Sequence, residues 1–235
     1  IIQAISIAIK QEKKLVRFGI SPFSVWRNKD KDPVRGSDTR AGQTNYDDLY
    51  ADILLWLKKG WIDYVTPQLY FTIGHSKVDY AKMVDWWSRN SYGRHIYIGH
   101  GIYKVEENEP GWNNPNELPN QIKQLRRYPN VQGSIYYSSR LFDKNPNGWN
   151  DSLKDNYYKY PALLPPMRWI DNEKPWPPIV ERTITQDSII QLIVKPDPRN
   201  RIEIKYYVVY QYATDSHSET FGNVPKYISR FVTLP

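Results

Sequence analysis

The chain has 235 residues, carries a net charge of +7 and contains no Cys, so one large domain or one and a half ordinary ones are expected. A disulfide scaffold and a zinc–cysteine site are excluded, and the chain lacks the roughly 18 consecutive apolar residues of a membrane span. The positive charge forms no Lys/Arg block, which argues against a nucleic-acid partner, while 9 Trp and 19 Tyr are enough for both a core and stacking platforms for sugar rings.

Apolar periodicity predicts that helices and strands alternate up to residue 160. The chain opens inside a helix, with neither Met nor a signal peptide, so we expect it to be a fragment of a longer protein. Asn45 and Ser76 are the predicted N-caps of two of the helices. The predicted helices cover residues 1–11, 46–59, 77–91, 117–128 and 151–160, and the predicted strands cover residues 16–22, 62–71, 95–99 and 131–138.

Four successive strand–helix units give either the second half of a (β/α)8 TIM-type barrel or a small doubly wound sheet. The loops after the predicted strands are long and rich in Trp, Tyr, His and Asn, whereas the loops before them are short. This asymmetry is typical of barrels with an active site on one face. A Gly-rich phosphate loop, which would favour the doubly wound sheet, is missing. We therefore favour an α/β half-barrel over residues 1–160.

A change of pattern follows the predicted half-barrel. Residues 161–178 hold six prolines and are predicted to form a linker or stiff strap. Residues 179–235 alternate in short apolar runs with a turn at Pro196–Pro198, as expected of an antiparallel β-sandwich. This stretch is shorter than a seven-strand module requires, so we expect only part of one.

Aromatic and polar side chains follow each predicted strand, at the end where parallel sheets bind ligands. An indole face stacks on a pyranose ring, and a guanidinium pairs with a carboxylate. Trp26 has the alternative of being wedged against the next loop, and Trp86–Trp87 is expected to pack in the core. His75 and His100 lack a third partner for a metal, so we expect no metal site and no cofactor. The candidate substrate-binding residues are Trp26, Arg27, Gln68, Tyr70, His75, His100, Tyr103 and Tyr137.

Glycosidases use two carboxyl groups, roughly 5 to 5.5 Å apart for retention of configuration and about 6.5 to 9.5 Å apart for inversion. Asp63 lies at the wrong end of its predicted strand, where a structural bond to a neighbouring amide is expected. Three acids near residues 47–52 suit helix-end roles. Only Asp38, Glu106, Glu107 and Glu109 lie in loops that follow strands. No strong acid pair emerges, and the catalytic residues stay unassigned.

Five blocks together resemble glycosyl hydrolase-like family 10, over about residues 1–160. They are FGISPFSVWRN, GSDTRAGQTNYDDLYADILLWLKKGWIDYVTPQLYF, DWW, YIGHGIY and GSIYYSS. The resemblance implies a (β/α)8 barrel followed by a fibronectin type III-like module, which PPIVERTI, IIQLIVKP and YYVVYQYA fit. It also implies cleavage of extracytoplasmic glycans, with peptidoglycan strands favoured, and catalytic acids mainly in the barrel half that precedes this chain.

Two functions therefore stay open. The chain is either the substrate-side part of a glycan hydrolase or a non-catalytic glycan-binding or scaffolding protein built on a barrel. The resemblance implies a periplasmic or cell-envelope location, with a lipid anchor on the full-length protein as an option.

Four strands cut from a barrel leave two open edges. We therefore expect pairing with the missing N-terminal half, self-association, or inclusion in a longer ordered molecule.

Overall fold

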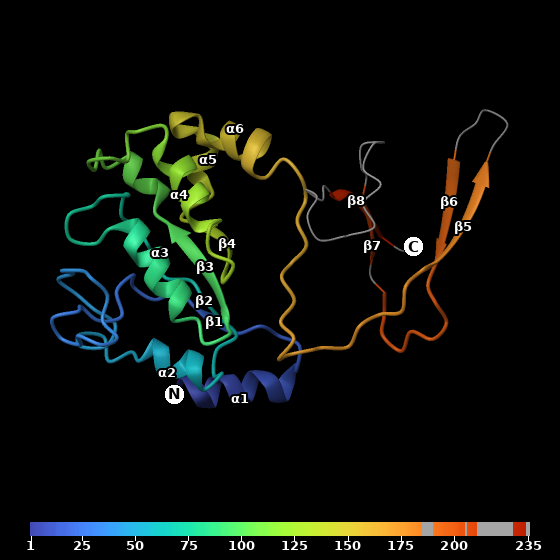
Figure 1. The fold of residues 1–235 in the computed structure, drawn as a ribbon, viewed down its shortest axis with the longest axis horizontal. Helices are drawn as coiled ribbons and strands as arrows, with labels where there is room; N and C mark the ends of the chain where they lie inside the picture. The colour runs from blue at the N-terminus through green and yellow to red at the C-terminus, as the bar shows by residue number, and fades with distance from the viewer. Residues whose placement is uncertain (185–189, 205, 211–227, 234–235) are drawn as a thin grey trace. The chain divides into compact units, whose positions relative to one another are not determined.

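The computed structural model describes residues 1–184, 190–204, 206–210 and 228–233, and the chain divides into two compact units (Figure 1). The first unit comprises residues 1–159 and 165–170, and the second comprises residues 160–164 and 171–235. The division falls inside the Pro-rich stretch predicted to be a linker, and the middle of that stretch belongs to the first unit.

The first unit is built on a parallel four-stranded sheet with strand order β1-β2-β3-β4. Each strand pairs with the next one in the sequence, so every connection moves the chain one place in the same direction. A doubly wound sheet reverses direction at a switch point, whereas this order is that of consecutive barrel strands. The sheet is therefore consistent with part of a barrel. Its strands are β1 (Gly19–Ile20), β2 (Tyr64–Val65), β3 (His95–His100) and β4 (Val131–Tyr136).

Helices alternate with these strands, as the periodicity predicted. The long connections contain α2 (Ile53–Lys58), α3 (Tyr80–Arg89) and α4 (Glu117–Leu125), and α1 (Ile2–Glu12) precedes the sheet. Short helical turns follow the last two strands: η1 (Ile102–Val105), α5 (Arg140–Asp143), η2 (Pro146–Gly148), α6 (Trp149–Ser152) and η3 (Leu153–Tyr157). Within the described ranges, no helix combines the length and apolar character needed to cross a bilayer.

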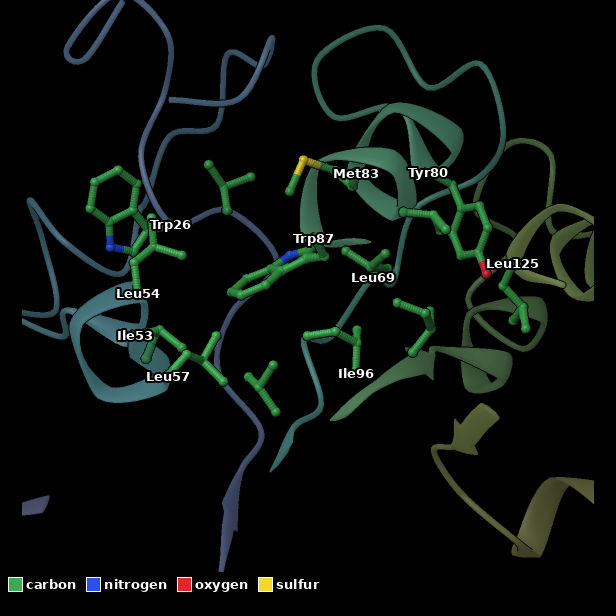
Figure 2. Packing of buried hydrophobic residues seen from close by; sticks show 14 of the residues in the cluster. Trp26, Ile53, Leu54, Leu57, Leu69, Tyr80, Met83, Trp87, Ile96 and Leu125 are labelled. Carbon is green, nitrogen blue, oxygen red and sulfur yellow. The ribbon is translucent and has the colours of Figure 1, made fainter. Parts of the chain in front are cut away.

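The core of the first unit lies between the sheet and its helices (Figure 2). Ile96 and Ile98 alternate along β3 and are both fully buried against the helices. Met83 and Trp87, one helical turn apart on α3, meet them from the other side. Burying one such side chain contributes roughly 1.5 to 3 kcal/mol. Trp87 is thus a core residue, as the sequence predicted.

Two predicted helix starts are wrong. The helix expected from residue 46 begins only at Ile53, where Asp52 Oδ1 accepts the Leu55 N–H at 3.1 Å. Asn45 instead donates its side-chain amide to the carbonyls of Phe23 and Val25, at 2.8 and 3.0 Å. The N-cap of α3 is Asp79 rather than Ser76. In both cases a carboxylate next to the helix captures the free N–H groups.

The face of the sheet away from the helices carries tyrosines that lie over glycines. A Cβ atom at Gly19 would lie 2.3 Å from the ring of Tyr64 on the neighbouring strand. On β3, Tyr97 alternates with the buried isoleucines, and its ring lies 3.5 Å from the Cβ position of Gly133 on β4. These close approaches are possible because glycine has no side chain. The surface that would be a barrel interior is therefore aromatic.

The second unit contains two antiparallel two-stranded sheets. One pairs β5 (Ile179–Ile184) with β6 (Ile190–Lys195), and the other pairs β7 (Tyr206–Tyr210) with β8 (Ile228–Thr233). The predicted antiparallel character is confirmed, but these pairs do not show a fibronectin type III-like module. The predicted strand residues 189, 211–213 and 227 lie outside the described residues.

Candidate functional site

Three predicted site residues, Tyr70, Tyr103 and Tyr137, meet at the carboxyl end of the sheet, and we call them the tyrosine cluster. The rings of Tyr70 and Tyr137 stack with centroids 6.1 Å apart and planes 20° apart. Tyr103 stands edge-on to both, at 5.8 and 5.6 Å. Stacked and edge-on pairs are the favourable geometries for aromatic rings. The cluster is a mutually supported aromatic surface drawn from three successive loops.

The backbone at the ends of β3 and β4 holds the cluster in place. The N–H of Tyr137 donates to the carbonyl of His100 at 2.9 Å, and the N–H of Tyr103 donates to the carbonyl of Tyr137 at 3.3 Å. Gly101 makes room for the third ring, because a Cβ there would lie 2.7 Å from Cβ of Tyr70. Tyr70 can therefore lie against β3 only while position 101 is glycine.

Gln68 lies beside the cluster. It bridges Phe23 and Gly99 through isolated parallel pairs. Its side-chain Nε2 donates to the carbonyl of Ser21 at 3.1 Å. A Cβ at Gly99 would lie 3.3 Å from Cα of Gln68 and 3.5 Å from the Tyr70 ring, so the two residues adjoin the same glycine. One amide donor of Gln68 is engaged by the loop after β1, and the amide oxygen has no protein donor among the described residues.

The cluster is partly open, and two of its three hydroxyl groups stay protonated near neutral pH. The side chain of Tyr137 is 59% exposed, whereas Tyr70 and Tyr103 are half-buried. Burial, reinforced by the two neighbouring tyrosines, raises the pKa of Tyr70 to about 12. Burial also raises the pKa of Tyr103. The hydroxyl groups of Tyr70 and Tyr103 are therefore neutral, able to donate a hydrogen bond as well as accept one.

A lysine that sequence reasoning missed borders the cluster. The Nζ atom of Lys104 lies 5.6 Å from the centroid of the Tyr103 ring. It also forms an ion pair with Glu109 and lies 3.8 Å from Glu107. Burial alone would lower the pKa of Lys104, but the hydrogen bond and charge of Glu109 raise it overall. Lys104 lies in η1, within the segment that follows β3, and that position was the available signal.

The acids proposed from the sequence are held in ion pairs. Glu106 pairs with Arg140 at 3.2 Å and with Lys144. Asp38 pairs with Lys82 at 2.5 Å. The hydrogen bond from Lys144 lowers the pKa of Glu106, and the bond from Lys82 lowers that of Asp38. A general acid must hold a proton at the working pH, so these two carboxylates do not suit that role in this arrangement.

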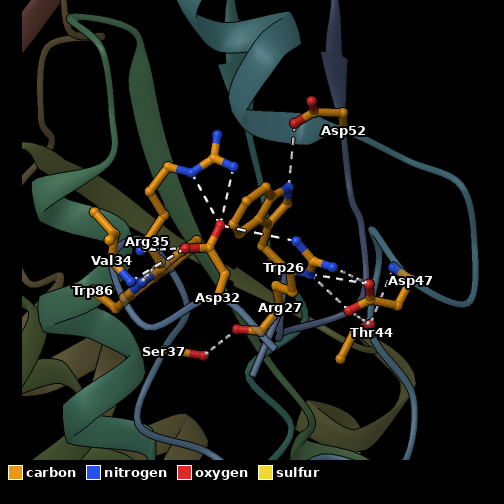
Figure 3. Close-up of polar contacts among 10 residues, drawn as sticks. All are labelled: Trp26, Arg27, Asp32, Val34, Arg35, Ser37, Thr44, Asp47, Asp52 and Trp86. Carbon is orange, nitrogen blue, oxygen red and sulfur yellow. Dashed lines mark hydrogen bonds and ion pairs between the residues drawn. The ribbon is translucent and has the colours of Figure 1, made fainter. Parts of the chain in front are cut away.

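Trp26 and Arg27 lie in a separate network in the loop after β1 (Figure 3). Trp26 has no exposed surface. Its indole stacks on Trp86 at 6.2 Å, and the guanidinium of Arg35 lies 5.0 Å from its ring. Its Nε1 donates to Asp52 at 3.3 Å. Trp26 therefore has no free face for a sugar ring, and the structure does not bring it to the tyrosine cluster.

Arg27 is similarly engaged. Its Nε lies 3.0 Å from both carboxylate oxygens of Asp47, and its NH2 lies 2.8 Å from Oδ1 (Figure 3). Asp32 is more distant, at 3.9 Å. The hydrogen bond to Asp47 raises the pKa of Arg27, so the guanidinium stays charged over the whole physiological range. The pair stabilises the long loop after β1.

The two predicted site histidines make protein contacts. His100 is fully buried, with Nδ1 2.8 Å from Gln121 Oε1 and Nε2 3.0 Å from Ser134 Oγ. An amide oxygen only accepts, so Nδ1 carries the proton and Nε2 accepts from the serine. Burial lowers the pKa of His100 to about 4. The Nδ1 atom of His75 accepts the N–H groups of Lys77 and Val78, at 3.3 and 3.1 Å, which closes the turn before α3.

The network around His100 continues to a buried acid that the sequence did not single out. Gln121 donates to Glu117 at 2.8 Å, and Glu117 also accepts the N–H of Ile73 at 2.8 Å. Burial raises the pKa of Glu117, which is 6% exposed. The spacing of Glu117 and Gln121, one turn apart on a predicted helix, was the only signal. These contacts join α4 to the ends of β2 and β3.

Metal binding has no ready site in this part of the molecule. Among the residues that the structure describes, no three or more His, Asp or Glu side chains gather closely enough to hold an ion.

Comparison with known proteins adds to this geometry. Residues 1–114 match the model of the family described as Glycosyl hydrolase-like 10. Glycosyl hydrolase YngK of Bacillus subtilis strain 168 is 42% identical over 217 residues, which cover 90% of this chain and 42% of that protein. Glycosyl hydrolase DigH of Escherichia coli K12 is 37% identical over 152 residues, covering 61% of this chain and 34% of that protein. The chain spans less than half the length of these relatives.

Proposed function

We propose that the chain, whose residues 1–114 match the Glycosyl hydrolase-like 10 family model and which is similar to YngK and DigH, supplies the substrate-side wall of a glycoside hydrolase site. The observation that carries the proposal is the tyrosine cluster at the carboxyl end of a barrel-like sheet. Glycan-binding sites need flat apolar faces for sugar rings together with hydrogen-bond donors for hydroxyl groups, and the cluster offers both.

We assign the parts of the wall by their exposure. Tyr137, with 59% of its side chain exposed, is the platform on which a sugar ring stacks. Tyr70 and Tyr103 support it and present neutral hydroxyl groups. Gln68 offers its amide oxygen to a sugar hydroxyl, because its amide nitrogen is already bound to Ser21. Lys104, paired with Glu109, gives the wall a charged border.

The proposal places the catalytic carboxyl groups in parts of the whole protein beyond this chain. Hydrolysis of a glycoside uses one carboxylic acid and one carboxylate facing the same bond. The strand-following acids Asp38, Glu106 and Glu109 are each held by a cation in the described structure. Relatives more than twice as long as the matched segment leave room for such a pair elsewhere.

The substrate class that we propose is an extracytoplasmic glycan of the peptidoglycan type, with the protein in the periplasm or cell envelope. This part of the proposal rests on the family resemblance. The second candidate is a non-catalytic glycan-binding protein on a barrel fold, and the ion-paired state of the strand-following acids favours it. The two candidates share the tyrosine wall and differ only in whether a bond is broken.

Reducing-end release from peptide-free glycan strands separates the candidates. We expect the 235-residue chain to bind the strands without releasing reducing ends, and a longer protein of the relatives' length that contains it to release them. Binding by both proteins without any release would favour the second candidate. Hydrolysis by this chain alone, abolished by Glu106→Gln or Glu109→Gln, would contradict the placement of the catalytic acids.

A further inference from the structure

The second unit contains a hollow of about 600 Å³ that the proposed glycan wall does not use. Its volume lies within the roughly 300 to 1,000 Å³ range of small-ligand sites. It is formed where the end of the Pro-rich stretch meets the turn after β6. The residues that line it are Glu173, Lys174, Trp176, Pro198, Arg199, Asn200, Arg201 and Ile202.

A half-exposed indole is fixed in this hollow by the turn beside it. The backbone N–H of Trp176 donates to Asn200 Oδ1 at 2.7 Å. The guanidinium of Arg199 lies over the indole, 3.9 Å from the ring centroid. The Trp176 side chain is nevertheless 50% exposed. The indole is therefore pre-positioned and still presents apolar surface, which lowers the entropy cost of binding a ligand there.

The turn itself is rigid because of one buried carboxylate. Asp197, which is 6% exposed, accepts two hydrogen bonds from the Arg199 side chain, at 2.9 and 2.7 Å, and one from its backbone N–H at 2.9 Å. These contacts lower the pKa of Asp197 to about 2. The positive charge of Arg199 is thus balanced by Asp197, and the guanidinium holds the indole in place.

Two other cations in the lining are unpaired. Within the described residues, neither Lys174 nor Arg201 has a hydrogen bond or ion pair from its side chain. Glu173 is the single lining acid. With Arg199 cancelled by Asp197, the lining keeps an excess of positive charge beside an apolar ring. That combination suits a ligand with a flat apolar face and a carboxylate, and each exposed charge pair adds only a modest amount of affinity.

We propose that this hollow is a second binding site, for a saccharide chain that carries carboxylate groups. A sugar ring packs on the exposed surface of Trp176, and a carboxylate of the same chain pairs with Lys174 and Arg201. The choice of a saccharide rests on the proposed function, whereas the choice of an anionic ligand rests on the lining charges. The site would hold a glycan strand independently of the tyrosine cluster.

The test uses the complete 235-residue chain labelled with 5-fluorotryptophan, with the Trp176 signal assigned from the Trp176→Phe variant. The probes are peptide-free peptidoglycan strands, which carry lactyl carboxylates, and chitohexaose, which is neutral. We expect the carboxylated strands to shift the Trp176 signal at concentrations where chitohexaose does not. Trp176→Ala removes the reporting ring, so its effect is read by calorimetric titration with the carboxylated strands, with Tyr137→Ala present in both proteins compared. Binding should weaken about tenfold, the loss expected of one aromatic contact.

Charge variants provide a matched comparison, read from the same Trp176 signal. Lys174→Gln should weaken binding of the carboxylated strands about 2- to 5-fold, and raising the salt concentration should do the same. Lys195→Gln should have no effect, because Lys195 lies outside the lining and pairs with Glu181 at 2.8 Å. Equal loss in both lysine variants would overturn the assignment of the carboxylate contact.

Further outcomes decide the proposal. An unmoved Trp176 signal, equal binding of chitohexaose, or tighter binding of an acidic peptide than of the glycan would each overturn it. The variant Tyr137→Ala separates this result from the proposed function. If affinity for the carboxylated strands falls in Tyr137→Ala but not in Trp176→Ala, the proposal of the tyrosine wall stands and that of the second site is overturned. If affinity falls in Trp176→Ala but not in Tyr137→Ala, the second site stands and the tyrosine wall is overturned.

Discussion

Asp63 Oδ1 accepts a hydrogen bond of 2.9 Å from the indole Nε1 of Trp169, a residue 106 positions later in the chain. The other carboxylate oxygen accepts the N–H of Phe18 at 2.8 Å and pairs with Lys10 at 2.9 Å. The guanidinium of Arg94 stacks on the ring of Trp169, 4.7 Å from its centroid. The middle of the Pro-rich stretch is thus anchored at the amino ends of the strands.

These contacts predict that Asp63 contributes strongly to the free energy of unfolding. Its carboxylate is 4% exposed and serves three donors. Asp63→Ala would leave buried donors without an acceptor, at a cost of about 2 to 4 kcal/mol in the free energy of unfolding. Urea unfolding measures this loss. The control is Asp85→Ala, which breaks only a surface pair with Arg89 on one helix and should cost less than about 0.5 kcal/mol. Similar costs for the two variants would refute the anchoring role.

The buried His100 predicts a loss of stability in mild acid. Its pKa is about 4 in the folded protein, below the ordinary value of 6.5, because burial disfavours the charged ring. As the pH falls through 6.5, the unfolded chain takes up a proton that the folded protein refuses, so stability declines until the pH reaches about 4. Between pH 7 and pH 4.5 this amounts to about 2 kcal/mol.

Urea unfolding of His100→Asn at the two pH values checks this expectation. The variant should be less stable at pH 7 but should lose about 2 kcal/mol less on acidification than the original protein. An unchanged slope in His100→Asn would mean that other groups cause the acid sensitivity.

The close approach of Tyr70 to Gly101 predicts that a side chain at position 101 disturbs the tyrosine cluster. A Cβ at this position would lie 2.7 Å from Tyr70, so Gly101→Ala must displace that ring. We expect a cost of about 1 to 3 kcal/mol in stability and weaker glycan binding. Gly42→Ala is the matched control, because nothing lies within 4 Å of its Cβ position. If Gly101→Ala binds glycan like the original protein, the position of Tyr70 does not matter for binding.

Replacing Trp26 should lower the stability of the protein without lowering its affinity for glycan, the opposite of what is expected for a binding residue. It is fully buried between Trp86 and Arg35, so Trp26→Ala should cost about 3 to 5 kcal/mol in stability. Glycan affinity per folded molecule should stay unchanged, as measured by titration at a temperature where the variant is still folded. A selective loss of affinity with normal stability would return Trp26 to the site.

The alternation of elements and the parallel sheet were predictable because the apolar periods of the first unit are strong. The alternation of side chains along β3 also indicates on which face of the sheet His100 lies. Ile96, Ile98 and His100 lie at successive same-face positions, and the two isoleucines are core residues. Ending the predicted strand at Gly99 hid that His100 faces the helices. Asp63 was predicted to bond a neighbouring amide, and the contact with the N–H of Phe18 confirms it.

Long-range partners could not be predicted. Nothing local to Trp26 indicates that Arg35 and Trp86 enclose it, and nothing in a Pro-rich stretch indicates that Trp169 reaches Asp63. The convergence of Tyr70, Tyr103 and Tyr137 was expected from their places after three strands. Its ring geometry depends on Gly101, whose role appears only when the neighbouring strand is in place.

The central claim is that the tyrosine cluster binds glycan, and a titration of Tyr137→Ala tests it most directly. Tyr92→Ala is the control, because Tyr92 is also partly exposed, at 44% against 59% for Tyr137, but precedes β3 at the other end of the sheet. Calorimetric titration with chitohexaose should show about tenfold weaker binding for Tyr137→Ala and no change for Tyr92→Ala. Equal affinity of the original protein and the Tyr137→Ala variant would contradict the account.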